Sequence, residues 1–146
     1  MSAAPDPYDL QRFVVAQDEG ATYRQALAEL REGHKRSHWM WFVFPQIAGL
    51  GRSPMARTFA IASLAEAEAY LDHPLLGPRL RECCEALLGV EGRSAEAVMG
   101  GTDALKLRSS MTLFAFAEPA EPLFRAVLDR YYGGAGDPAT EAILNF

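Results

Sequence analysis

Apolar residues recur at intervals of three and four along most of this chain, the spacing that places them on one face of an α-helix. The segment 22–33 is an example, with Ala26, Leu27 and Leu30 as its apolar face and Gly33 after its last turn. Alternation of apolar and polar residues between hairpin turns, the pattern of half-buried strands, does not occur. The pattern therefore predicts helices from one end of the chain to the other.

Residues that favour helix ends divide the chain into short helices. Ser53 and Asp137 each precede a proline, which is favoured at the first helical position, and Ser63 with Glu66 forms a capping box. Asp9 is the N-cap expected for the first helix. In chain order, the expected helices cover residues 9–17, 22–33, 53 onward, 63–73, 74 to about 88, 94–100, 102 or 103 to about 117, 119 or 121 to 132, and 137 onward.

The chain has the size and composition of a single globular domain. Its 146 residues suffice for one core, and its apolar content of 49% with 23% charged residues separates it from disordered proteins. We expect one compact all-α domain of eight or nine helices over residues 9–146, after a flexible N-terminus over residues 1–8. The net charge of -5 argues against general nucleic-acid binding, which requires a basic surface.

Two adjacent cysteines, Cys83 and Cys84, are too few and too close for a disulfide framework or a four-ligand zinc site. They indicate a reducing compartment, in which both are small buried residues of a helix. The sequence does not begin with a basic segment followed by an apolar run, and its apolar runs fall far short of the roughly 20 residues of a membrane span. We therefore expect a cytoplasmic protein that contacts no membrane and holds no metal or cofactor.

The segment 34–46, HKRSHWMWFVFPQ, places basic residues directly before a run of large apolar ones. Residues 38–44 are short enough to form either a buried helix or a buried strand. We favour a helix capped by Ser37, because a lone strand in a helical chain has no partner for its backbone groups. Such a helix is apolar on every side, so we expect it at the centre of the fold.

The basic residues before this run form a candidate anion site. The free N–H groups and the dipole at a helix start favour a negative charge, to which Lys35, Ser37 and His38 would add a cation and hydrogen bonds. His38 can also carry protons near neutral pH. Trp39 and Trp41 either fill the core or hold a ligand ring beside the cations. The alternative is that the basic side chains are solvated and that His38 is structural.

The segment 102–116, TDALKLRSSMTLFAF, is a second apolar helix, and it carries a polar stripe. Asp103, Lys106 and Ser110 are spaced by three and four, so they share one face. Burying Lys106 is costly unless a carboxylate or an anionic ligand compensates its charge. Two interpretations are open: an internal Asp103–Lys106 pair, or a ligand-binding Lys106 with Asp103 as the helix N-cap.

These segments give a first functional hypothesis, a polar pocket for a small anionic metabolite that resembles a nucleotide or a phosphate. His38 and Asp103 would supply proton transfer if the protein is also an enzyme, a hydrolase or transferase of phosphorylated or ribosylated compounds. A second hypothesis is a non-catalytic interaction module, in which exposed Trp and Arg side chains contact another protein. The ligand-binding residues of the first hypothesis are Lys35, Ser37, Trp39, Trp41, Gln46, Lys106 and Ser110.

Several stretches of the chain resemble a family of bacterial and fungal proteins that is defined as a domain of unknown function. The matching stretches are GHKRSHWMWFVFPQIAGLGRS and MGGTDALKLRSSMTLF, supported by DLQRFVVAQ, YLDHPLLGPRL and DPAT. The resemblance covers roughly residues 9–144 and implies a compact all-α domain without an established activity. Members are often mislabelled calpastatin-like, but calpain inhibitors of that kind are long, disordered and repetitive, whereas this chain is short and rich in core residues.

Overall fold

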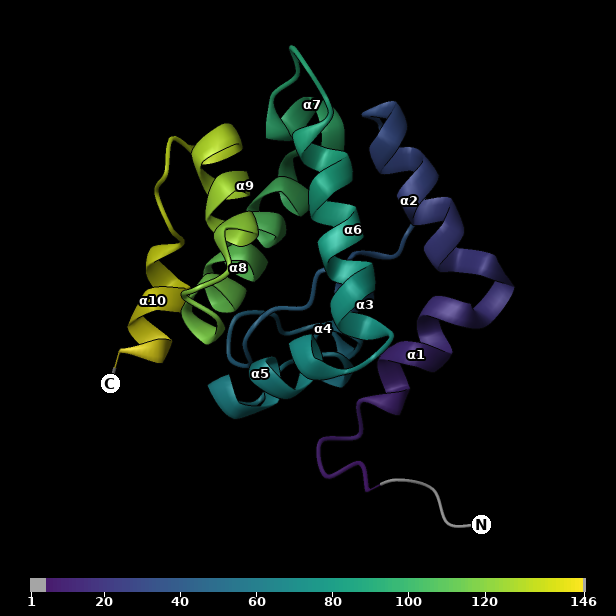
Figure 1. Ribbon diagram of the computed structural model, residues 1–146, viewed down its shortest axis with the longest axis vertical. Helices are drawn as coiled ribbons and strands as arrows, with labels where there is room; N and C mark the ends of the chain where they lie inside the picture. Colours follow the sequence, from purple (N-terminus) through teal and green to yellow (C-terminus); the bar gives the residue numbers. More distant parts are fainter. Residues whose placement is uncertain (1–4, 146) are drawn as a thin grey trace.

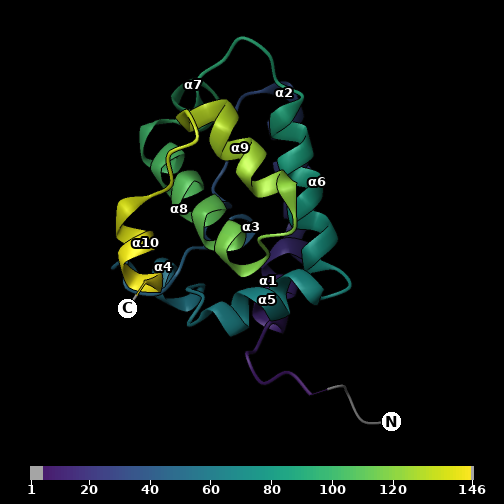
Figure 2. The ribbon, with the colours of Figure 1, turned by 60° about the vertical axis from the view of Figure 1, so that its left-hand side comes forward.

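The longest helix, α8, forms the centre of the molecule. The computed structural model describes residues 5–145, and α8 spans Gly101–Ala117. Ten of its 17 residues are buried, because other helices pack on most of its surface. Figures 1 and 2 show α9 and α10 beside it. The helices that pack most closely on α8 are α5 (Leu64–Asp72), α7 (Ala95–Met99), α9 (Pro122–Tyr132) and α10 (Pro138–Leu144).

A second group of helices covers the other side of the fold. Helix α6 joins the two groups, since it contacts α2 on one side and α5 and α9 on the other. Helix α1 packs on both α2 and α3. The members of this group are α1 (Gln11–Asp18), a 3-10 turn (Glu19–Ala21), α2 (Thr22–Glu32), α3 (Met40–Val43), α4 (Pro54–Thr58) and α6 (Leu76–Leu88).

The prediction of an all-α domain with eight or nine helices is confirmed. Nine α-helices in residues 5–145 have five residues or more, and α3 adds a single turn. The same residues contain no β-strand. Their one β-bridge joins two loops, in which the Ala48 N–H donates to the Ile61 carbonyl at 2.8 Å and the Ile61 N–H donates to the Gln46 carbonyl at 2.9 Å. This bridge holds the 46–48 loop in place after α3.

Most of the predicted helix starts are confirmed by their hydrogen bonds. The hydroxyls of Ser53, Ser63 and Ser94 each accept an N–H three residues ahead at 3.1 Å. In a capping box the Glu66 carboxylate would accept the N–H of Ser63. Here it accepts the N–H of the preceding residue, Ala62, at 2.9 Å. Thr22, Pro122 and Pro138 are the first residues of their helices.

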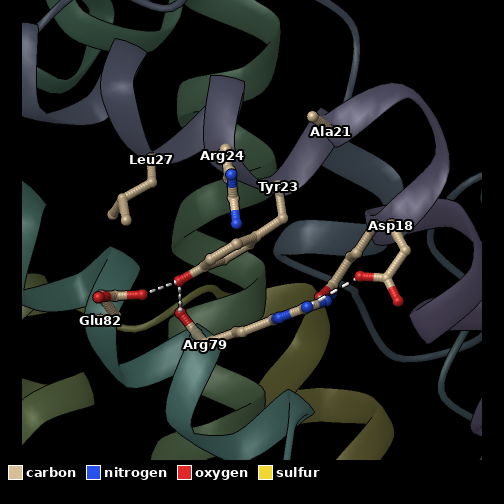
Figure 3. Close-up of a pocket in the computed structure, with 8 residues that line it drawn as sticks. Asp18, Ala21, Tyr23, Arg24, Leu27, Arg79 and Glu82 are labelled. Carbon is tan, nitrogen blue, oxygen red and sulfur yellow. Dashed lines mark hydrogen bonds and ion pairs between the residues drawn. The ribbon is translucent and has the colours of Figure 1, made fainter.

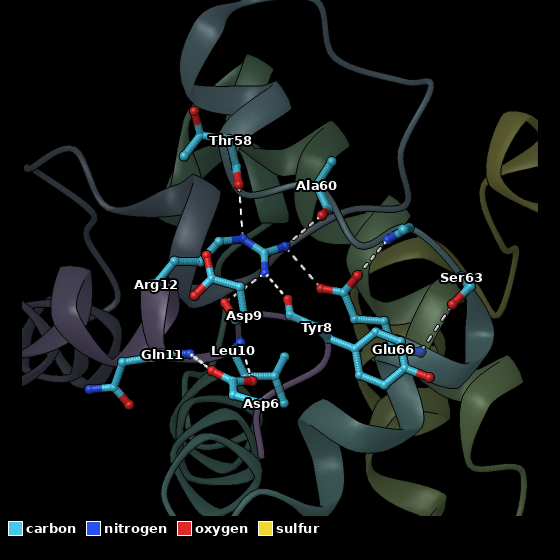
Figure 4. A network of polar contacts seen from close by, with 11 residues as sticks. Asp6, Tyr8, Asp9, Leu10, Gln11, Arg12, Thr58, Ala60, Ser63 and Glu66 are labelled. Atoms are coloured by element: carbon cyan, nitrogen blue, oxygen red, sulfur yellow. Dashed lines mark hydrogen bonds and ion pairs between the residues drawn. The ribbon is translucent and has the colours of Figure 1, made fainter. Parts of the chain in front are cut away.

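Asp9 does not cap the first helix, and this prediction was wrong. The carboxylate of Asp6 accepts the N–H groups of Leu10 at 2.7 Å and Gln11 at 2.9 Å, as Figure 4 shows. Asp9 instead has a φ of 52°, a left-handed conformation that Asp tolerates better than most residues. The chain therefore turns sharply at Asp9 and brings the earlier carboxylate to the helix end. Residues 1–4 of the predicted flexible N-terminus lie outside the described part of the chain.

The helix expected to begin at Ser37 is only the single turn α3. Trp39 precedes its first residue, and the Ser37 hydroxyl donates to Glu29 at 2.6 Å instead of capping a helix. The expected burial is nevertheless present, because Trp39 and Phe44 are both fully buried. The segment is thus a core element held mainly by side-chain packing and by its bonds to α2.

Cys83 and Cys84 are free and buried, as expected for small core residues of a helix. Burial raises the pKa of the Cys83 thiol to about 12, so the thiolate that reacts in cysteine chemistry is not formed near neutral pH. Within residues 5–145, no helix combines the length and the apolarity that crossing a membrane requires.

Candidate functional site

Glu29 is a buried carboxylate that organises the loop before α3. It accepts the N–H groups of Arg36 at 2.8 Å and Ser37 at 3.0 Å, and the Trp39 indole N–H at 3.0 Å. Burial raises the pKa of Glu29, but hydrogen bonds from the Ser37 hydroxyl, the Arg36 N–H and Trp39 outweigh it and lower the pKa to about 2. An ionised carboxylate therefore fixes the position of the loop that carries Lys35.

The chain has two lysines, Lys35 and Lys106, and both reach the carboxylate of Asp103. The Lys35 ammonium lies 2.8 Å from Oδ2, and the Lys106 ammonium lies 3.9 Å from Oδ1. Their side chains are 6% and 24% exposed, so Lys35 is enclosed while Lys106 is open to a ligand. The Lys35 N–H donates to the Val98 carbonyl at 2.7 Å, which ties the loop to α7 beside the start of α8. The two segments singled out in the sequence thus meet at one carboxylate.

Each ammonium also faces an indole ring. Lys35 lies 4.8 Å from the centroid of Trp39, and Lys106 lies 5.1 Å from the centroid of Trp41. Both distances are within the range of a cation–π interaction. The side chains form a continuous row, which we call the Lys–Trp row, in the order Trp39, Lys35, Asp103, Lys106 and Trp41.

Two buried polar atoms have no hydrogen-bond partner in the described residues, the indole nitrogen of Trp41 in this row and the hydroxyl of Ser110 on α8. The two other buried hydroxyls on α8 are paired: Ser109 donates to Asp137 at 2.9 Å, and Thr112 donates to the Arg108 carbonyl at 2.7 Å. Ser110 follows Lys106 by one helical turn. Buried polar atoms without partners are uncommon in folded proteins, so this pair is a marked feature of the site.

The remaining predicted residues lie elsewhere or play other parts. His38 is exposed, and Gln46 is half-buried with its main-chain carbonyl engaged by Ile61. Within residues 5–145, no hydrogen bond, ion pair or cation–π interaction joins either side chain to the Lys–Trp row. Ser37 acts on the row indirectly, through Glu29 and through its carbonyl, which accepts a hydrogen bond from the Lys35 ammonium.

Glu29 is the residue that sequence reasoning missed. It lies three residues after Ala26 and next to Leu30, on the apolar face of α2, and only 1% of it is exposed. A charged residue on an otherwise apolar face was the available signal, because a buried carboxylate requires several donors.

Comparison with known proteins places the chain in a family. The model of a family described as proteins of unknown function, DUF1810, matches residues 7–144. The chain belongs to the DUF1810 family. This confirms the resemblance to a domain of unknown function, and the DUF1810 match extends over both halves of the Lys–Trp row.

A solved structure has the same fold as this DUF1810 protein. The crystal structure of the conserved hypothetical protein Rv1873 from Mycobacterium tuberculosis is 56% identical in sequence and superposes with a TM-score of 0.93. The similarity covers 97% of this chain and 99% of that one. No curated protein matches the sequence.

Proposed function

We propose that this DUF1810 protein binds a small anionic metabolite at the Lys106 end of the Lys–Trp row. The observation that carries the proposal is the pair of unpartnered buried atoms: Trp41 Nε1, whose ring the Lys106 ammonium faces at 5.1 Å, and Ser110 Oγ, one helical turn after Lys106. An indole N–H only donates, and a hydroxyl and an ammonium both donate, so the three groups suit a ligand rich in acceptor oxygens. Phosphate and carboxylate groups have this character.

The charges of the row also favour an anion. Lys35 and Asp103 are close enough to neutralise each other. The Lys106 ammonium lies 3.9 Å from the Asp103 carboxylate, so its N–H groups remain available to a ligand. Glu29 is ionised, but its hydrogen bonds come from neutral groups. The row Lys35–Asp103–Lys106 therefore has one net positive charge at its open end, and an anion there completes the pairing.

The proposal is for binding, without a reaction. Proton transfer between His38 and Asp103 would require the exposed imidazole to reach a carboxylate that two ammonium groups already occupy. The alternative role as a protein-interaction module relied on an exposed patch of Trp39 and Trp41, and Trp39 is fully buried. A small ligand fits the remaining donors better, which are the Lys106 ammonium, the Trp41 indole N–H and the Ser110 hydroxyl.

A thermal-shift panel tests the proposal. Orthophosphate, AMP, ribose 5-phosphate and ADP-ribose are added to the wild type and to Lys106→Met, with Arg125→Met as a control that removes a cation from an exposed position on α9. A ligand at about 100 times its Kd adds roughly 2.7 kcal/mol to the unfolding free energy. We expect at least one of these anions to raise the Tm of the wild type and of Arg125→Met.

In Lys106→Met the affinity for that anion is expected to fall at least about tenfold, because a hydrogen bond to a charged group contributes on the order of 1.5–3 kcal/mol. Ser110→Ala should weaken binding by a smaller factor without lowering stability, since the hydroxyl has no partner to lose. The site assignment fails if no anion of the panel raises the wild-type Tm, or if Lys106→Met responds as strongly as Arg125→Met.

A further inference from the structure

A cavity of about 570 Å³ opens between α2 and α6, and none of the residues that line it belongs to the Lys–Trp row. Its volume is in the range of small-molecule sites. Figure 3 shows its side chains converging from the end of α1, from α2 and from α6. The polar residues that line this α2–α6 cavity are Gln17, Asp18, Tyr23, Arg24, Arg79 and Glu82.

One wall of the α2–α6 cavity is a guanidinium fixed from within the core. Arg79 donates to Asp18 at 2.8 Å and to the amide oxygen of Gln17 at 3.2 Å. Gln17 is only 1% exposed, and its amide nitrogen donates in turn to the Phe42 carbonyl at 2.7 Å and to the Tyr70 hydroxyl at 3.3 Å. The position of Arg79 is therefore set by hydrogen bonds that continue into the core, as expected for a preorganised site.

Tyr23 forms the adjacent wall. Its ring lies 4.8 Å from the Arg79 guanidinium, and its hydroxyl donates to the carboxylate of Glu82. Burial raises the pKa of Tyr23, so the hydroxyl stays protonated and keeps one oxygen of Glu82 in place. Leu27 adds an apolar surface beside the ring.

The rim of the cavity carries charged groups of both signs, in which Asp18 is paired with Arg79 at 2.8 Å and Glu82 with Arg31 at 3.7 Å. Arg24 is exposed and forms no ion pair within residues 5–145. The side chains of Asp18 and Glu82 are 53% and 47% exposed, so each carboxylate retains capacity for another donor. A simple anion would meet two carboxylates here, and a simple cation would meet two guanidinium groups. A molecule that carries both charges can pair with Arg24 and with a carboxylate of the rim.

We propose that the α2–α6 cavity binds a small zwitterion of the α-amino acid class. Its carboxylate is held by Arg24, its ammonium group by Glu82, and its side chain lies against Tyr23 and Leu27, the two residues nearest Glu82 in Figure 3. Charged hydrogen bonds at both ends fix the orientation of such a ligand. This site is separate from the anion site at Lys106, and neither depends on the other.

The two charged ends of the ligand can be tested one at a time. The twenty amino acids are titrated into the full chain by isothermal calorimetry, and the strongest binder is compared with its amide, which lacks the carboxylate, and with its N-acetyl form, which lacks the ammonium. At least one amino acid should bind, and each modified form should bind at least tenfold more weakly. Failure of all twenty to bind, or equal binding of the parent and either modified form, would overturn the proposal.

Variants assign the binding to the cavity. Arg24→Met removes a cation from an exposed helix position, so the fold is retained, and it should lower the affinity for the parent amino acid at least tenfold while leaving the affinity for its amide unchanged. Arg125→Met should bind as the wild type does. Lys106→Met should also bind as the wild type does, which separates this result from the fate of the anion site. Unchanged affinity in Arg24→Met would contradict the assignment.

Discussion

Replacing Glu29 with alanine is expected to lower the free energy of unfolding by about 4 kcal/mol. The change leaves the buried Trp39 indole and the partly buried N–H groups of Arg36 and Ser37 without their acceptor, and an unpaired buried donor costs about 1–3 kcal/mol. Urea denaturation followed by circular dichroism measures the loss. Glu85→Ala, at an exposed position on α6, is the matched control and should change stability by less than about 0.5 kcal/mol.

The contribution of Glu29 also has a defined pH dependence. Its pKa in the folded protein is lowered to about 2 from an ordinary value of 4.5, so the unfolded chain takes up a proton at a higher pH than the folded chain does. The resulting stability, about 3 kcal/mol at 1.36 kcal/mol per unit, is fully present above about pH 5 and is lost as the pH falls from 4.5 towards 2.

Glu29→Gln cannot be protonated in this range, so its stability should depend less on pH than that of the wild type between pH 5 and pH 3. The wild type and Glu29→Gln should therefore approach each other in stability as the solution becomes more acidic. Parallel curves for the two proteins would show that Glu29 is not the carboxylate whose ionisation stabilises the fold.

Arg12→Met is expected to destabilise the fold by about 3–5 kcal/mol. The Arg12 guanidinium joins the start of α1 to the loop between α4 and α5 (Figure 4). Its partner Glu66 is 4% exposed and would be left as an unpaired carboxylate, which is costly in the interior. The groups that accept its hydrogen bonds are the carbonyls of Tyr8, Asp9, Thr58 and Ala60 and the carboxylate of Glu66.

A double-mutant cycle separates the ion pair from the other bonds of Arg12. Glu66→Met removes the carboxylate. The double variant should therefore lose less unfolding free energy than the sum of the losses in the two single variants. The coupling measured by urea denaturation should be at least about 1 kcal/mol. Additive losses would mean that the 2.9 Å contact between the two side chains contributes no net stability.

The helix starts at Ser53, Ser63 and Ser94 were predictable because the residues that form them are close in sequence. Ser53, Ser63 and Ser94 bond to N–H groups three residues ahead, so the local pattern contains the whole interaction. The start at Ser37 was not predictable in this way. Glu29 takes the N–H groups of Arg36 and Ser37 from seven and eight residues away, and this bond competes with helix formation before α3.

The candidate site was predictable only within each segment. Asp103, Lys106 and Ser110 share a helix face, and helical spacing alone reveals this. That Lys35 closes on Asp103 at 2.8 Å depends on how the loop packs against α7 and α8, which no local pattern contains. The α2–α6 cavity escaped prediction for the same reason, since Gln17, Tyr23 and Arg79 come from three separate helices.

The two tryptophans provide a direct probe of the anion site, because each gives one indole N–H signal in a proton–nitrogen correlation spectrum. The Trp39 indole donates to Glu29 at 3.0 Å, whereas the Trp41 indole has no partner among the described residues. Titration with AMP and with ribose 5-phosphate should move the Trp41 indole proton downfield and leave the Trp39 signal in place, and neither signal should move in Lys106→Met. A Trp41 signal that stays fixed at saturating concentrations of both compounds, or a shift that persists in Lys106→Met, would contradict anion binding at this end of the row.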